Sequence, residues 1–211
     1  MSYTFHEQLY RTAPAMEKLH AVPITICGAG ALGANIAESL ARSGVSQLTV
    51  IDCDRIDDRN LSTQPYYRED VGAKKVGLLE NHLYQAVGVE MAAIDKRLSP
   101  TNATRLLKSA RLVIDAFDNS EARQSVADAC WVVQIPCLHV GLFRDYGEVL
   151  WNESYRVPSD ANDDICDYPL ARNLVMLVVA IAAEIAIRYI TTGEQDNRMI
   201  TFQDFKVSEW T

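Results

Sequence analysis

The chain has 211 residues, a formal net charge of −8 and a sequence pI near 5.0. This length fits one domain, over residues 1–211, with a core of its own. The acidic balance argues against nucleic acid or an anionic membrane as a partner, because both require a basic patch. The five cysteines include no Cys-x-x-Cys pair and the N-terminus is not signal-like, so we expect a reduced, cytoplasmic protein without zinc.

The first segments predict a lead-in helix and then a βαβ unit. Apolar residues approximate helical spacing over residues 1–20. Over residues 22–54, an apolar run breaks into G-A-G-A-L-G, continues as an amphipathic helix, turns at Gly44 and re-enters an apolar run that ends at Asp52. This order of elements favours nucleotide binding over a purely structural use of the same glycines.

Each glycine of the motif has its own role in such a unit. Gly28 permits the tight turn, Gly30 lets backbone amides approach a phosphate, and Gly33 allows the helix to lie close to the strand. An anion can then bind at the helix N-terminus. Asp52 follows roughly 20 residues later, where a carboxylate can accept hydrogen bonds from ribose hydroxyls.

The rest of the chain alternates strands and helices. A polar loop over residues 55–75 is followed by a predicted helix, a third strand over 91–98, a short helix over 102–107, a strand over 112–116, a helix over 120–131 and a strand over 132–140. This alternation predicts a Rossmann-like α/β fold, with a mostly parallel sheet and helices on both faces.

An antiparallel continuation of the sheet is predicted from the C-terminal part. It would comprise a hairpin of residues 147–151 and 155–157 and an edge strand within 199–207. Residues 158–169 form a turn-rich, acidic crossover loop before an apolar run over 174–187. That run contains Glu184 and is shorter than the roughly 18 residues of a membrane span, so we interpret it as a buried helix.

Several motifs then coincide with one family. They are G-A-G-A-L-G, D-C-D at 52–54, N-L-S-T-Q at 60–64, V-G-A-K-K-V at 71–76 and D-A-F-D-N at 115–119. The chain resembles the ubiquitin-activating-type adenylyltransferases, the group of ThiF, MoeB and HesA, from about residue 17 to residue 192. Its shortness, its lack of zinc cysteines and its A-F-D-N sequence look most like the compact ThiF-like family 2 proteins.

The resemblance implies a reaction with ATP and Mg²⁺. The C-terminal glycine carboxylate of a ubiquitin-like sulfur-carrier protein, similar to ThiS, would attack the α-phosphate, and charge neutralisation would lower the barrier. It also implies a homodimer. The alternatives are adenylation of a small-molecule carboxylate and a non-catalytic module that binds a nucleotide or a ubiquitin-like protein. A NAD dehydrogenase fits the glycines but explains none of the later motifs.

By position, the resemblance implies roles for individual residues. Asp118 matches the Mg²⁺-binding aspartate and Lys75 the phosphate-contacting lysine, while the implied nucleotide-binding positions also include Asp52, Asp54, Asn60, Gln64 and Asn119. Two structural alternatives remain open at this stage. The Asp118-Asn119 pair can cap a helix instead, and Lys74 can take the place of Lys75.

Thr63 departs from the sequence pattern of the family. Thr63 occupies the place where the family usually has an arginine, so Arg11, Arg59 and Arg68 are the candidates that could supply that charge instead.

In several relatives, a cysteine placed like Cys166 forms a thioester with the activated carrier, and a loop thiolate is suited to that chemistry. The aspartates around Cys166 disfavour a thiolate, so catalytic and structural roles are both open.

Overall fold

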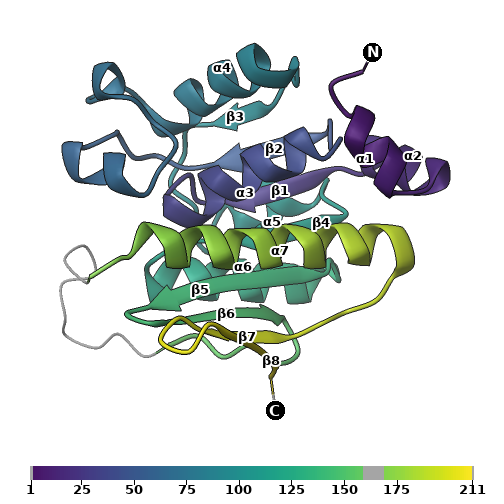
Figure 1. The fold of residues 1–211 in the computed structure, drawn as a ribbon. Helices are drawn as coiled ribbons and strands as arrows, with labels where there is room; N and C mark the ends of the chain where they lie inside the picture. The colour runs from purple at the N-terminus through teal and green to yellow at the C-terminus, as the bar shows by residue number, and fades with distance from the viewer. Residues whose placement is uncertain (1, 159–168, 211) are drawn as a thin grey trace.

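One sheet of eight strands organises the computed structural model, which describes residues 2–158 and 169–210 (Figure 1). The strands are β1 (Ile24–Cys27), β2 (Leu48–Ile51), β3 (Ala92–Ile94), β4 (Leu112–Asp115), β5 (Cys137–Phe143), β6 (Tyr146–Trp151), β7 (Arg198–Thr201) and β8 (Lys206–Glu209). Their order is β3-β2-β1-β4-β5-β6-β7-β8. The first five run parallel and the last three add antiparallel neighbours, which confirms the predicted fold class.

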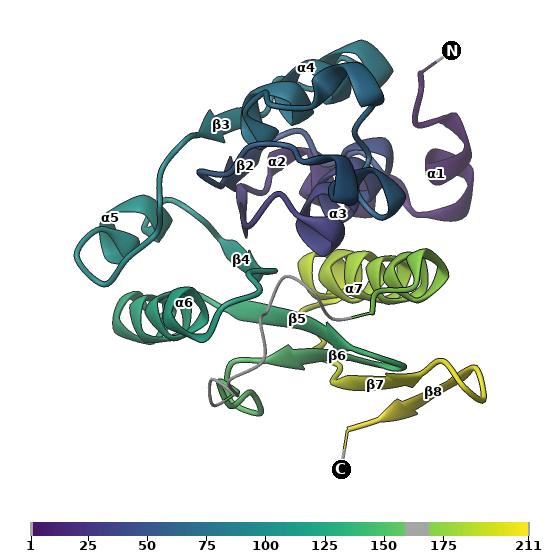
Figure 2. The same ribbon diagram turned by 90° about the vertical axis from the view of Figure 1, so that its left-hand side faces the viewer.

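Helices cover both faces of this sheet (Figure 2). They are α1 (Phe5–Tyr10), α2 (Ala13–Ala21), α3 (Ala31–Arg42), α4 (Lys75–Val87), α5 (Ala103–Leu107), α6 (Ser120–Val133) and α7 (Arg172–Thr192), with 3-10 turns η1 (Asp58–Ser62) and η2 (Arg68–Asp70). Helices α3 and α7 pack together on one face, and α5 and α6 pack together on the other.

The core is divided by the sheet into two clusters because side chains alternate along each strand. On β1, Ile26 belongs to the cluster beneath α3 and α7, whereas the next residue, Cys27, belongs to the cluster beneath α5 and α6. On β4, Ile114 and Val113 divide in the same way. These strands are buried on both faces, which is why they are short continuous apolar runs in the sequence.

The N-terminal lead-in differs from the single helix expected over residues 1–20. It consists of α1 and α2, separated at Arg11 and Thr12. Thr12 has an extended backbone, and its hydroxyl accepts a hydrogen bond from the amide of Ala15 at 3.3 Å, so it caps the start of a new helix.

Several predictions in the C-terminal half were wrong in extent. Helix α6 continues to Val133 and ends at Gln134, whose left-handed backbone (φ 55°) stops the helix, so β5 begins only at Cys137. The hairpin between 147–151 and 155–157 does not form, because β6 pairs with β5 and β7 instead. The expected edge strand is a hairpin, β7 and β8. Tertiary pairing, which sequence periodicity does not report, decided these boundaries.

Helix α7 is the one helix among residues 2–158 and 169–210 that is long and apolar enough to cross a membrane by length and composition. It packs against α2, α3, β5 and β6, and half of its most apolar stretch is buried inside the protein. Its apolar character is therefore accounted for by its position beside α3 on one face of the sheet (Figures 1 and 2), in agreement with the buried helix expected over 174–187.

A substitution of Gly33 tests how closely α3 approaches β1. A Cβ atom at this position would overlap the backbone carbonyl oxygen of Gly28, and neither backbone can move without displacing the helix. We expect Gly33→Ala to lower the free energy of unfolding by about 3 kcal/mol in urea denaturation. The control is Gly77→Ala in α4, where nothing lies within 4 Å of the new Cβ, and which should gain about 0.5–1 kcal/mol.

Candidate active site

The candidate site lies where the loops after β1, β2 and β4 meet. Strand β1 pairs with β2 on one side and β4 on the other, so the chain reverses its direction of progress through the sheet at β1. Two backbone hydrogen bonds tie the loops together: the amide of Gly28 donates to Ile51 at 2.8 Å, and the amide of Ala116 donates to Cys27 at 2.9 Å. Open α/β sheets bind ligands at this kind of switch point.

Asp52 holds the glycine turn in place. Its Oδ2 accepts a hydrogen bond from the amide of Ala29 at 2.6 Å, and its Oδ1 accepts one from the amide of Asp54 at 2.7 Å. The residue is only 7% exposed. Burial raises the pKa of Asp52, while nearby Lys75 and the two amides oppose that rise. Asp52 therefore lies beside the glycine turn, as expected for a residue at a nucleotide site.

Lys75, and not Lys74, belongs to this cluster. Lys75 is the first residue of α4, is 7% exposed, and has its Nζ 3.5 Å from Oδ2 of Asp54. Lys74 points elsewhere, since its Nζ donates to the carbonyl of Cys53 at 2.6 Å and to Asp95 at 2.9 Å. The alternative that Lys74 serves in place of Lys75 therefore finds no support in the geometry.

Asp118 and Asn119 have different roles in the structure. Asn119 is the cap of α6, because its Oδ1 accepts a hydrogen bond from the amide of Ala122 at 2.9 Å. Asp118 is exposed, and within residues 2–158 and 169–210 it receives only a long contact, 3.4 Å, from the amide group of Asn119. Helix capping thus explains Asn119, and its expected nucleotide contact stays a prediction, whereas the Asp118 carboxylate remains open to a ligand.

The segment from Asn60 to Gln64 lies beside the glycine turn and has one buried polar atom without a partner. Asn60 Oδ1 accepts from the amide of Asp57 at 2.9 Å and so stabilises η1. Oε1 of Gln64 is buried and has no hydrogen-bond partner among the described residues. Since buried polar atoms are normally paired, this oxygen is a position where a ligand donor can bind.

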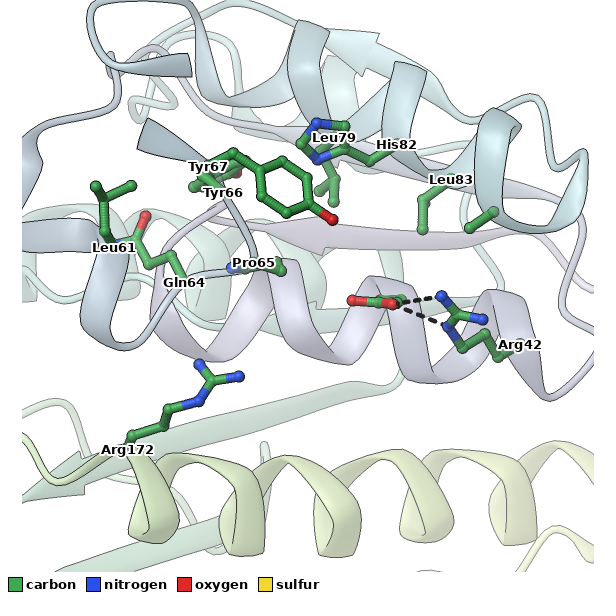
Figure 3. A pocket seen from close by; sticks show the side chains of 12 residues that line it. Arg42, Leu61, Gln64, Pro65, Tyr66, Tyr67, Leu79, His82, Leu83 and Arg172 are labelled. Atoms are coloured by element: carbon green, nitrogen blue, oxygen red, sulfur yellow. Dashed lines mark hydrogen bonds and ion pairs between the residues drawn. The ribbon is translucent and has the colours of Figure 1, made fainter. Parts of the chain in front are cut away.

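Gln64 also lines a cavity of about 350 Å³ between α3, α4 and the start of α7 (Figure 3). Tyr66 and Tyr67 contribute to the wall, and the Tyr66 hydroxyl donates to the carbonyl of Ala29 at 2.9 Å, which connects the cavity to the glycine turn. Arg172 extends from the first turn of α7 toward Gln64 in the same cavity (Figure 3).

The three arginines that could supply the charge missing at Thr63 lie in three different places in the structure. The Arg11 guanidinium donates to both carboxylate oxygens of Glu184, at 3.1 and 2.7 Å, and to Glu7 at 2.6 Å, so it serves the packing of α1 against α7. Arg59 lies 3.4 Å from Asp57, and Arg68 is exposed on η2. Arg172 was missed because it follows the crossover loop, more than 100 residues after Thr63 in the sequence.

The remaining expectations concern metals and a cysteine. Among residues 2–158 and 169–210, no group of three or more His, Cys, Asp and Glu side chains is arranged to hold a metal ion. A single carboxylate such as Asp118 is compatible with Mg²⁺, which is commonly held by one or two carboxylates together with substrate phosphates. Cys166 falls outside the described residues, so its role stays a prediction.

The strand order, the glycine turn at the start of α3 and the acidic residue after β2 are those of the Rossmann-like class of fold, in which such a turn is a common nucleotide site. The ThiF family model matches residues 6–210, and the chain belongs to the ThiF family.

Curated relatives match somewhat less than two thirds of the chain. The sulfur carrier protein adenylyltransferase of Thermus thermophilus is 33% identical over 136 residues, covering 63% of this chain and 50% of the relative. The sulfur carrier protein ThiS adenylyltransferase of Bacillus subtilis is 33% identical over 135 residues, covering 62% and 40%. The matched regions thus span half or less of these relatives' lengths.

Solved structures support the same fold. The E. coli protein MccB, in a crystal structure with ATP, superimposes with a TM-score of 0.82 at 19% identity, covering 98% of this chain and 69% of that protein. A second MccB structure, in complex with N-formylated MccA, gives a TM-score of 0.83 at 17% identity, covering 98% and 70%. At these identities the likeness establishes the fold alone.

Substitutions of the adjacent residues 118 and 119 test the division of roles described above. Asn119→Ala removes the cap of α6 and is expected to lower the free energy of unfolding by about 1 kcal/mol. Asp118→Asn leaves the cap intact and should unfold at the wild-type urea concentration. Equal destabilisation by both changes, measured by circular dichroism, would show that Asp118 also supports the helix.

Proposed function

We propose that the protein uses ATP and Mg²⁺ to adenylate the C-terminal glycine carboxylate of a ubiquitin-like, ThiS-like sulfur-carrier protein. The observation that carries this proposal is the arrangement at the carboxyl edge of the sheet: Asp52 contacts the glycine turn, Lys75 lies beside Asp54, and Asp118 follows β4, which pairs with β1. The adenylyltransferase relatives support the reaction type. We further propose that the protein is cytoplasmic and forms a homodimer. Light scattering tests the oligomeric state: a strict monomer that adenylates its substrate would contradict the homodimer.

The glycine turn has room and hydrogen-bond donors for a nucleotide. Gly30 is the N-cap of α3 and offers no side-chain acceptor to the first amides of the helix, which are therefore free to bind phosphate oxygens. No atom of the described residues lies within 4 Å of the position that a Cβ on Gly30 would occupy. The backbone itself does not require glycine there, since φ is −85°. Close approach of a ligand is thus the reason that remains for this glycine.

The reaction would be an in-line displacement at phosphorus. A carboxylate oxygen of the carrier forms a bond to the α-phosphorus, the bond to the bridging oxygen breaks, and pyrophosphate leaves with that electron pair. Lys75 would stabilise the negative charge on the phosphates, while Asp52 would orient the ribose and Asp118 would hold Mg²⁺. The Mg²⁺ ion would supply further neutralisation of the phosphate charge.

A second candidate is adenylation of a small-molecule carboxylate. The fold shared with MccB, for which there is a crystal structure with ATP, is compatible with this candidate. A non-catalytic module is the third candidate, because Thr63 lacks the charge of the family arginine. ATP–pyrophosphate exchange separates all three. Exchange with a Gly-Gly-ending carrier supports the proposal, exchange with only a small acid supports the second, and none with either supports the third.

The nucleotide part of the proposal predicts selective stabilisation. At a concentration one hundred times the dissociation constant, ATP with Mg²⁺ should raise the free energy of unfolding by about 2.7 kcal/mol, whereas NAD should have no effect. Thermal unfolding measures both. The variant Gly30→Ala tests the glycine turn. Its added methyl group meets no atom of the described residues within 4 Å, so the variant should fold normally, yet it should no longer be stabilised by ATP. Stabilisation by NAD and not ATP would contradict the adenylation proposal.

A further inference from the structure

Four side chains outside the proposed catalytic set form a buried, hydrogen-bonded cluster next to the loop that carries Asp118. They are Asp115 on β4, Arg123 on α6, His139 on β5 and Tyr155 after β6, each at most 8% exposed. The sequence predicts that His139 ends a buried strand and favours a structural role over a catalytic one. It is in fact the third residue of β5, with its ring fully buried.

The cluster is centred on the carboxylate of Asp115. Its Oδ2 lies 2.8 Å from Nδ1 of His139 and 3.6 Å from a guanidinium nitrogen of Arg123. The same arginine nitrogen donates to the hydroxyl of Tyr155 at 3.1 Å, and the other one donates to the carbonyl of Val140 at 2.9 Å. The Tyr155 ring stacks on His139 with centroids 3.8 Å apart. Each side chain is therefore held by at least two contacts.

Burying the charges of Asp115 and Arg123 is unfavourable because both groups lose hydration. Burial alone would raise the pKa of Asp115, but Arg123 and His139 hold it below its ordinary value, so the carboxylate stays ionised. Apolar residues of similar size often fill such a space with equal or greater stability. Stability is therefore a weak reason for the cluster, and its geometric effect on the adjacent loop is the stronger one.

The cluster holds the loop of residues 116–119 from both ends. At the start, Oδ1 of Asp115 accepts a hydrogen bond from the amide of Phe117 at 3.2 Å. At the end, α6 begins with the Asn119 cap, and Arg123 in the first turns of that helix contacts the same Asp115. Asp118 lies in the middle of this loop and is exposed.

We propose that Asp115 and His139, supported by Arg123 and Tyr155, are positioning residues that fix the loop of residues 116–119 so that Asp118 binds the metal ion of a bound nucleotide. This inference rests on the proposed function. It predicts that loss of the cluster weakens metal binding and leaves contacts to the nucleotide base and ribose intact. A cluster that only stabilises the fold would change the melting temperature without changing metal affinity in the folded protein.

The experiment measures Mn²⁺, a paramagnetic substitute for Mg²⁺, by electron paramagnetic resonance in the presence of the full chain and α,β-methylene ATP. His139→Leu removes the donor to Asp115 and should weaken Mn²⁺ binding to the protein–nucleotide complex about tenfold, the lower end of the range for partners that orient a metal ligand. Affinity for the metal-free analogue, measured by calorimetry, should stay at the wild-type value. His139→Asn, which can place an amide N–H near the former Nδ1, should restore part of the Mn²⁺ affinity.

Controls separate this inference from the proposed function. Asp118→Asn should lose Mn²⁺ binding; if it does not, or if the wild type fails to bind the Mn²⁺–nucleotide complex, both proposals are overturned. If Asp118→Asn loses Mn²⁺ but folded His139→Leu binds it as the wild type does, only the positioning role is overturned. Should His139→Leu fail to fold, Tyr155→Phe keeps the ring stack and removes only the acceptor for Arg123; wild-type Mn²⁺ affinity in that variant overturns the inference.

Discussion

The close approach of α3 to β1 is the contact on which the rest of the structure depends. Gly33 lies against the backbone of Gly28 so closely that no side chain fits between them. This contact brings the first amides of α3 to the carboxyl edge of the sheet, where the loops after β2 and β4 also end. Helix α7, the longest helix described, packs on α3, so the same contact also determines where the C-terminal half of the protein lies.

If the protein binds ATP as proposed, its acidic surface requires that the attraction to the phosphates come from groups close to them. The chain carries a net charge of −8, so long-range attraction does not favour ATP. Within the site, Lys75 is buried next to the carboxylates of Asp52 and Asp54, which outnumber its single positive charge before a ligand binds. Short-range hydrogen bonds from the start of α3, together with Lys75, would therefore provide the affinity for phosphates.

The substitution at Thr63 is accommodated by a contact that does not involve its side chain. Asn35 on α3 donates from its Nδ2 to the carbonyls of Ala31 at 2.6 Å and of Thr63 at 2.9 Å. The backbone of this segment is therefore held against α3 whichever residue occupies position 63. Arg172 reaches the neighbouring cavity from α7, so the fold still supplies an arginine close to Gln64 by a different route.

Local motifs in the sequence were enough to predict the fold class, the glycine turn and the residues around it. The reason is that Gly28, Gly33 and Asp52 act within one βαβ unit, whose geometry is specified by neighbouring residues. Sequence alone left open which of Lys74 and Lys75 faces the site, and whether Asp118 or Asn119 caps α6. Both depend on side-chain direction, which the three-dimensional packing determines.

Tertiary structure alone decided the contacts between distant segments. Arg11 pairs with Glu184 across 173 residues, Arg172 faces Gln64, and His139 meets Asp115 across a pair of strands. No local pattern marks these residues, because each becomes functional or structural only through a partner that the sheet order brings near. The sequence by itself thus determined the βαβ unit with its glycine turn, while the packing of α6, α7 and β5 around it decided which charges surround the candidate site.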